Sequence, residues 1–123
     1  MENSAKLLEH SLLVIWNDRN AERRLQAMEN IYADDMAFYE SNEGPAIVGN
    51  QAINDLISKL QQQWPLEFEF QLNGPASINH HVQHVAWNLG IPGQAPEATG
   101  MDIAIIKDGK IKSLHLFLNL PPA

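Results

Sequence analysis

The chain has 123 residues, the usual size of one domain, so a second hydrophobic core would not fit and we expect a single domain over residues 1–123. Apolar residues make up 45% of the chain, which favours a packed core and argues against wholesale disorder. Fifteen acidic residues against eight basic ones give a formal charge of −7, and this balance disfavours binding to the phosphate backbone of a nucleic acid.

Membrane and secreted classes are disfavoured as well. No apolar run approaches the ~18 residues that a membrane-spanning helix needs. The segment from Met1 to Lys6 lacks the basic and apolar regions of a secretory signal. The chain has no cysteine, which excludes disulfides, thiolate nucleophiles and cysteine-bound zinc. We therefore expect a cytoplasmic protein without a membrane partner.

Helical periodicity dominates the first half of the chain. Apolar residues recur three and four positions apart over residues 4–18, 20–33 and 51–63. Asn20 is a candidate N-cap for the second of these helices. Pro65 ends the third, because proline disfavours a helical conformation in the residue before it. The pattern predicts three helices.

Strand patterns surround and follow the third helix. After Pro65 the apolar period changes from 3.6 to 2, and Asp108-Gly109 marks a tight turn between the last two strands. Six strands are predicted, over residues 36–40, 46–48, 66–72, 78–90, 98–107 and 110–119. Helices gathered at one end of the chain and long strands at the other predict an α+β fold, with the helices laid on one face of a curved, mostly antiparallel sheet.

Two local patterns accompany this order of elements. The first is Trp16-Asn17-Asp18, followed by the run from Ile31 to Phe38. The second runs from Gly100 through Asp102 and Asp108-Gly109 to Asn119. Together they resemble the nuclear transport factor 2-like (NTF2-like) superfamily, which includes SnoaL-like cyclases and ketosteroid isomerases. The resemblance implies a cone-shaped half-barrel around a pocket for a small apolar molecule, and a homodimer formed through the open sheet face.

The resemblance also implies a pair of catalytic carboxylates. Glu40 matches the general base of the ketosteroid isomerases, and Asp102 matches their buried acid, which donates a hydrogen bond to the developing oxyanion. The alternatives are a solvated acid at a strand end for Glu40 and an edge group satisfied by the backbone for Asp102. The oxyanion tyrosine of that family falls at Leu12, and one donor fewer would cost about 3 kcal/mol of transition-state stabilisation.

Strand register decides the role of His115. With a two-residue loop at Asp108-Gly109, Asp102 lies opposite His115, and the two side chains are near enough for an acid–imidazole dyad. With a bulged loop the register moves by one residue, His115 points to the other face, and Asp102 lies beside Leu114. The resemblance favours the bulged form.

Aromatic residues supply the other candidate ligand contacts. Trp16, Tyr32, Tyr39 and Trp87 fill either the core or the pocket wall, since the two merge in this fold, whereas Trp64 is expected to act as a packing anchor. His80, His81 and His84 invite a metal interpretation. However, residues 80 and 84 of one strand stand about 13 Å apart, so we expect no metal, and no nucleotide-binding motif indicates a cofactor.

Two functions of different classes remain open. The first is a cofactor-independent isomerase, cyclase or dehydratase that acts on a small apolar carbonyl compound by acid–base chemistry. The second is a non-catalytic module that binds a small molecule in the same pocket or dimerises through its sheet. The missing tyrosine at Leu12 favours the second.

Overall fold

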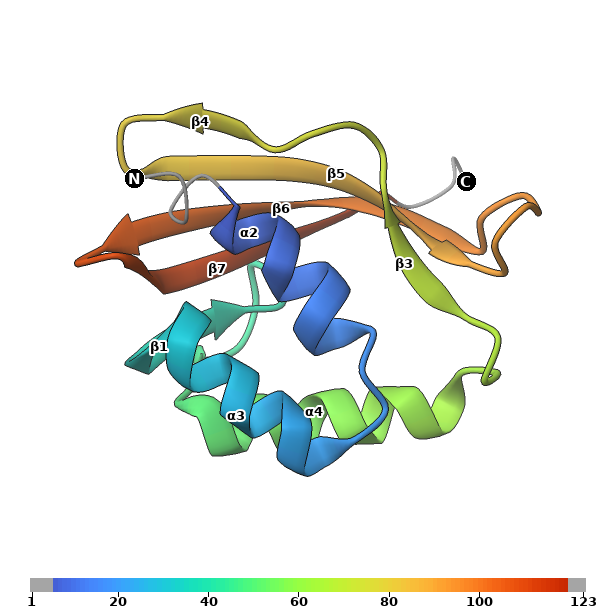
Figure 1. Ribbon diagram of the computed structural model, residues 1–123, viewed down its shortest axis with the longest axis horizontal. Helices are drawn as coiled ribbons and strands as arrows, with labels where there is room; N and C mark the ends of the chain where they lie inside the picture. The colour runs from blue at the N-terminus through green and yellow to red at the C-terminus, as the bar shows by residue number, and fades with distance from the viewer. Residues whose placement is uncertain (1–5, 120–123) are drawn as a thin grey trace.

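The computed structural model describes residues 6–119, and its helices all lie on one side of a curved sheet (Figure 1). The helical segments are α2 (Leu7–His10), η1 (Ser11–Trp16), α3 (Ala21–Ile31) and α4 (Asn50–Gln63). The α+β class and the three helical regions are confirmed. Residues 4 and 5 of the first predicted helix lie outside the described part of the chain.

The first helical region changes geometry partway along. It starts as the α-helix α2 and continues as η1, which is a π-helix of six residues. Its buried side chains are those of Ser11, Leu12, Ile15 and Trp16, while Leu13 and Val14 are exposed. Wider turns of this kind are rare, and they often occur at functional sites. Here they place Leu12 and Trp16 on the face that meets the sheet.

The second and third helices have well-defined ends. The side chain of Asn20 accepts a hydrogen bond from the Arg23 backbone N–H, so the predicted N-cap of α3 is confirmed. This helix ends at Ile31, two residues earlier than predicted, because Tyr32 already adopts an extended conformation and begins strand β1. Gly49, with φ of 92°, precedes α4 in a conformation that favours glycine.

The sheet has seven strands in the order β2-β1-β7-β6-β5-β3, with β4 also pairing with β5. Their bounds are β1 (Tyr32–Tyr39), β2 (Ile47–Val48), β3 (Glu69–Leu72), β4 (Ser77–Asn79), β5 (Val82–Gly90), β6 (Ala98–Lys107) and β7 (Lys110–Asn119). All pairings are antiparallel except that of β1 with β7. The first strand along the sequence, β1, and the last, β7, thus lie side by side.

One predicted strand is two strands. Residues 78–90 divide into β4 and β5, which form a hairpin whose turn holds His80 and His81. His80 has φ of 53°, a left-handed conformation that interrupts a strand. The prediction of a continuous strand was wrong because alternation of side chains does not reveal where the backbone reverses.

Alternation along the strands separates two faces of the sheet. The inner face, against the helices, carries every second residue, including Val85, Trp87 and Leu89 of β5 and Leu114 and Leu116 of β7. The intervening residues form the outer face. The core therefore lies between the helices and the inner face, and a site between them is built from both layers. No helix in residues 6–119 is long and apolar enough to cross a membrane.

Candidate ligand pocket

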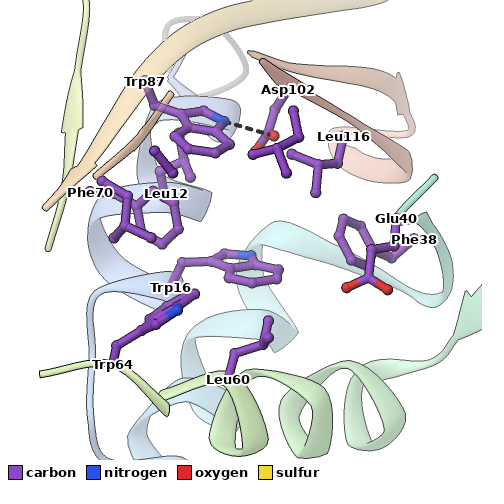
Figure 2. Close-up of a pocket in the computed structure, with 13 residues that line it drawn as sticks. Leu12, Trp16, Phe38, Glu40, Leu60, Trp64, Phe70, Trp87, Asp102 and Leu116 are labelled. Atoms are coloured by element: carbon purple, nitrogen blue, oxygen red, sulfur yellow. Dashed lines mark hydrogen bonds between the residues drawn. The ribbon is translucent and has the colours of Figure 1, made fainter. Parts of the chain in front are cut away.

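A cavity of about 250 Å³ lies between the helices and the inner face of the sheet. Most of its wall is apolar, and aromatic rings make up a large part of it (Figure 2). The side chains that line it are those of Leu12, Trp16, Phe38, Glu40, Leu60, Trp64, Phe70, Trp87, Leu89, Ala98, Asp102, Leu116 and Leu118. Asp102 and Glu40 are the only ionisable residues among these lining residues.

Asp102 reaches the cavity from the middle of β6. Its residue is 4% exposed, and the indole Nε1–H of Trp87 donates a hydrogen bond to its Oδ1 at 3.0 Å (Figure 2). Trp87 can lie across β6 because Gly100 stands opposite it: a Cβ on Gly100 would come within 2.5 Å of the indole ring. The glycine, the tryptophan and the aspartate therefore form one local arrangement that orients the carboxyl group.

Burial governs the ionisation of Asp102. Removal of the carboxyl group from water raises its pKa to about 7, and the hydrogen bond from Trp87 opposes this rise by favouring the charged form. Near neutral pH the group can therefore hold a proton. In that state it can donate a hydrogen bond to a ligand in the cavity.

Glu40 lines the same cavity and is the residue directly after strand β1. It follows β1, two residues after the buried Phe38, and therefore shares the inward side of that strand. The side chain is exposed, and Figure 2 shows its carboxylate approaching the cavity from another side than Asp102. The structure thus brings the two predicted carboxylates to one cavity, one in an apolar setting and the other in contact with water.

The predicted aromatic contacts divide into two groups. Trp16 and Trp87 line the cavity. Tyr32 does not: it is fully buried behind the wall, where its hydroxyl meets Ser11 Oγ at 2.6 Å and accepts from Trp16 Nε1 at 3.2 Å. Burial raises the pKa of Tyr32 above its ordinary value. Its hydroxyl therefore supports Trp16 and is not aimed at the cavity.

Tyr39 and His115 lie on the outer face of the sheet. Their rings stack with centroids 4.7 Å apart, at paired positions of β1 and β7. The hairpin has a two-residue turn, with Lys107 opposite Lys110, but a bulge follows and shifts the register, so that Asp102 pairs with Leu116 and His115 pairs with Ile103. The acid–imidazole dyad is therefore wrong, and neither His115 nor Tyr39 lines the cavity.

Sequence reasoning missed several residues that shape the site. Trp64, expected only to pack, lines the cavity, and the ring of Phe70 makes edge-to-face contacts with Trp16, Trp64 and Trp87. The alternation of Leu66, Phe68, Phe70 and Leu72 with polar residues was visible in the sequence, but it did not show that Phe70 would reach the cavity while Leu66 would be exposed. Among residues 6–119, no group of three or more His, Asp or Glu residues is placed to hold a metal ion.

A buried arginine behind the cavity was also missed. Arg24 of α3 is 1% exposed and donates to the side chains of Asn54, Ser58 and Gln61 on α4 and to the backbone carbonyl of Asp18. The Gln61 amide in turn donates to the carbonyl of Trp16 at 3.1 Å. This network joins η1, which carries Trp16, to α4, which carries Leu60 and ends one residue before Trp64. A signal existed, because Arg24 stands four residues before Met28 on the buried stripe of α3.

Comparisons with known proteins identify the fold. No family model and no curated protein matches the chain. Among solved structures, a protein named as an isomerase of the SnoaL-like family from Agrobacterium tumefaciens has a TM-score of 0.83 at 22% identity, over 98% of this chain and 100% of its own.

Two further structures agree. A protein named as a SnoaL-like polyketide cyclase from a Jannaschia species has a TM-score of 0.76 at 11% identity, over 96% of this chain and 86% of its own. A protein named as a ketosteroid isomerase from Kribbella flavida has a TM-score of 0.70 at 16% identity, over 99% of this chain and 84% of its own. The chain therefore has the NTF2-like fold, a fold that carries many unrelated functions.

Proposed function

We propose that this chain, with its NTF2-like fold, is a cofactor-independent enzyme that moves a proton on a small apolar carbonyl compound, as isomerases, cyclases and dehydratases do. The observation that supports this most is the pair of carboxyl groups on one apolar cavity, Asp102 buried and Glu40 exposed. Environments that push two acids apart in pKa allow one to act as a proton donor while the other acts as a base.

The proposed reaction follows from these two environments. The Glu40 carboxylate removes a proton from the carbon next to the substrate carbonyl, and the electron pair of the broken C–H bond moves towards the carbonyl oxygen. Protonated Asp102 donates a hydrogen bond to that oxygen as it becomes an enolate. Return of the proton from Glu40 to another carbon completes an isomerisation, with no net change in protons. Because Leu12 lines the cavity and carries no donor, Asp102 acts without a second side-chain donor at that position.

Proton exchange with solvent tests this proposal without knowledge of the natural substrate. We expect the protein to catalyse the exchange of the α-protons of 2-tetralone, a bicyclic ketone, in D2O, followed by proton NMR. General acid–base catalysis is worth about 10²–10⁴-fold, so Glu40→Gln should lower the exchange rate by that amount and Asp102→Asn should lower it at least tenfold. The rate should also fall as pH rises above about 7, where Asp102 loses its proton.

Glu43→Gln is the matched control, because this glutamate is exposed, lies three residues from Glu40 and does not line the cavity. This variant should catalyse the exchange of the 2-tetralone α-protons at the wild-type rate. Full activity in both cavity variants, or no exchange above the buffer rate in the wild type, would leave the alternative, a module that binds a small molecule without chemistry.

We also propose that the protein is a homodimer through the outer face of the sheet. The central strands β5, β6 and β7 place no charged side chain on this face between residues 82–88, 99–105 and 113–119. Exposed Ile105, Phe117 and Tyr39 add apolar surface there. Since the chain carries a formal charge of −7, an uncharged face is where two copies meet with the least repulsion.

A further inference from the structure

We infer that the cavity takes an uncharged, flat ring compound of about ten non-hydrogen atoms with one oxygen, and that it rejects both steroid-sized and anionic compounds. This inference rests on the site of the proposed function and names its substrate class. It follows from the size of the cavity, from the rings in its wall and from the charges around it.

The size of the cavity sets the first limit. Its volume of about 250 Å³ is near the small end of ligand pockets. A buried apolar cavity of about 150 Å³ is known to hold benzene, which has six carbon atoms, so in proportion about ten non-hydrogen atoms fit here. That is the size of two fused six-membered rings. A compound with four fused rings has about twice as many atoms and would need the wall to move.

The wall selects for flat rings. Phe70 stands at its centre, with ring centroids 5.1 Å from Trp87, 5.8 Å from Trp64 and 6.1 Å from Trp16, and each of these contacts is edge-to-face. Leu12, Leu60 and Leu116 line the remaining space (Figure 2). Another aromatic or conjugated ring can continue the same edge and face contacts, which stabilise a bound ring beyond simple burial.

The polar atoms beside Asp102 admit one oxygen. Of the three indole N–H groups in the wall, those of Trp16 and Trp87 are already used within the protein, by Tyr32 and by Asp102 Oδ1, and that of Trp64 lies on the side of the cavity away from Asp102 (Figure 2). The second oxygen of Asp102 has no hydrogen-bond partner among the described residues. A ligand hydroxyl or carbonyl that meets this oxygen satisfies the buried acid, and an apolar ring without one leaves it unsatisfied.

Charge excludes anions. Glu40 and Asp102 line the cavity, and neither lysine, arginine nor histidine is present among its lining residues to neutralise a carboxylate or phosphate. A protonated amine would suit the carboxylates and the indole faces by cation–π attraction. We favour the uncharged ligand because Asp102 is 4% exposed in an otherwise apolar wall, where an ammonium group would lose its water, and the raised pKa of Asp102 supports a neutral partner.

Calorimetric titration of the purified protein at pH 6 with probes of matched shape tests the inference. The probes are 2-naphthol, 2-naphthoate and 2-naphthylmethylammonium, which differ in charge, and a steroid 3-ketone, which differs in size. We expect 2-naphthol to bind at least tenfold more tightly than each of the other three. Asp102→Leu, which keeps the branching and the number of heavy atoms but removes the polar group, should weaken the binding of 2-naphthol at least tenfold.

Enlarged cavities provide the matched control. Trp64 and Leu60 line the side of the cavity away from Asp102, so Trp64→Ala or Leu60→Ala should improve steroid binding at least tenfold relative to 2-naphthol (Figure 2). Two variants are used because one of them can fail to fold. Tighter binding of the anion, of the cation or of the steroid by the wild type would overturn the inference, as would binding of none of the probes. These readings need no turnover, so they are independent of the exchange experiment.

Discussion

Asp102 is the residue at which stability and the proposed function oppose one another. Its pKa of about 7 in the folded chain lies well above its ordinary value of 3.8, because burial disfavours the charged form. Between pH 4 and pH 7 the folded protein therefore holds a proton that the unfolded chain has lost. By linkage, stability falls as pH rises through this window, and above pH 7 the full cost of burying the carboxylate remains.

Replacement of this acid should stabilise the protein while it lowers activity. A shift of about three pKa units corresponds to roughly 4 kcal/mol, so we expect Asp102→Asn to raise the free energy of unfolding by up to that amount at pH 8 and by little at pH 4. Urea unfolding at both pH values measures it. Glu97→Gln, at an exposed acid, is the control and should leave the pH dependence unchanged. Equal stabilities of wild type and Asp102→Asn at pH 8 would contradict the assigned burial.

The sequence predicted the two carboxylates that meet at the cavity, but it did not predict the residues that fix their orientation. The positions of Asp102 and Glu40 came from motif resemblance, and alternation along β6 and β1 places both side chains inward. The role of Gly100 was not predictable in the same way, because it depends on which residue of β5 lies opposite it. Pairing between distant strands is decided by the whole sheet and not by either strand alone.

At the scale of the elements, helices α3 and α4 are joined by buried hydrogen bonds, whereas most helix pairs are joined by apolar side chains. Five hydrogen bonds of the Arg24 guanidinium reach α4 and the end of the first helical region. Desolvation lowers the pKa of Arg24, which reflects its place in the interior. A buried cation is tolerated when its donors are satisfied, and its loss leaves several acceptors unpaired.

Neighbouring arginines offer a matched test of this network. Arg24→Met should lower the free energy of unfolding by about 3 kcal/mol or more, because Asn54, Ser58 and Gln61 lose their donor. Arg23 is the control, since its side chain is 67% exposed and pairs with Asp18 at the surface. Arg23→Met should cost less than about 1 kcal/mol. Chemical denaturation of both variants compares them, and equal effects would show that the network adds nothing to stability.

The last strand shows which details of an element the sequence contains and which were overlooked. Residues 110–119 were predicted correctly as a strand, but the bulge at Lys112 was not located. Its signal is the apolar spacing: Ile111 and Leu114 are both fully buried although they stand three residues apart, which regular alternation forbids. The turn has the two-residue form that was considered, with Lys107 opposite Lys110. Beyond the bulge, the pairing matches neither predicted register, because Asp102 pairs with Leu116 and not with His115 or Leu114.

At the scale of the molecule, the two faces of the sheet have different tasks. The inner face and the helices line the cavity, and the central strands of the outer face present uncharged and apolar side chains to solvent. The fold class was predictable because it depends on the order and period of elements, which survive errors of one or two residues. The cavity was not, since its volume depends on how Trp16, Trp64, Phe70 and Trp87 pack against one another.

The outer face gives the last prediction. Phe117 is 55% exposed there, beside Met101 of the next strand, so Phe117→Asp places a charge at the centre of the proposed dimer interface. A buried unpaired charge costs several kcal/mol, and we expect the wild type to be a dimer and this variant to be a monomer by light scattering at micromolar concentration. Leu66→Asp is the control, because Leu66 is 82% exposed, lies outside the central strands of this face and should leave the dimer intact. A monomeric wild type would refute the dimer directly, and a dimeric Phe117→Asp would place the interface on another surface.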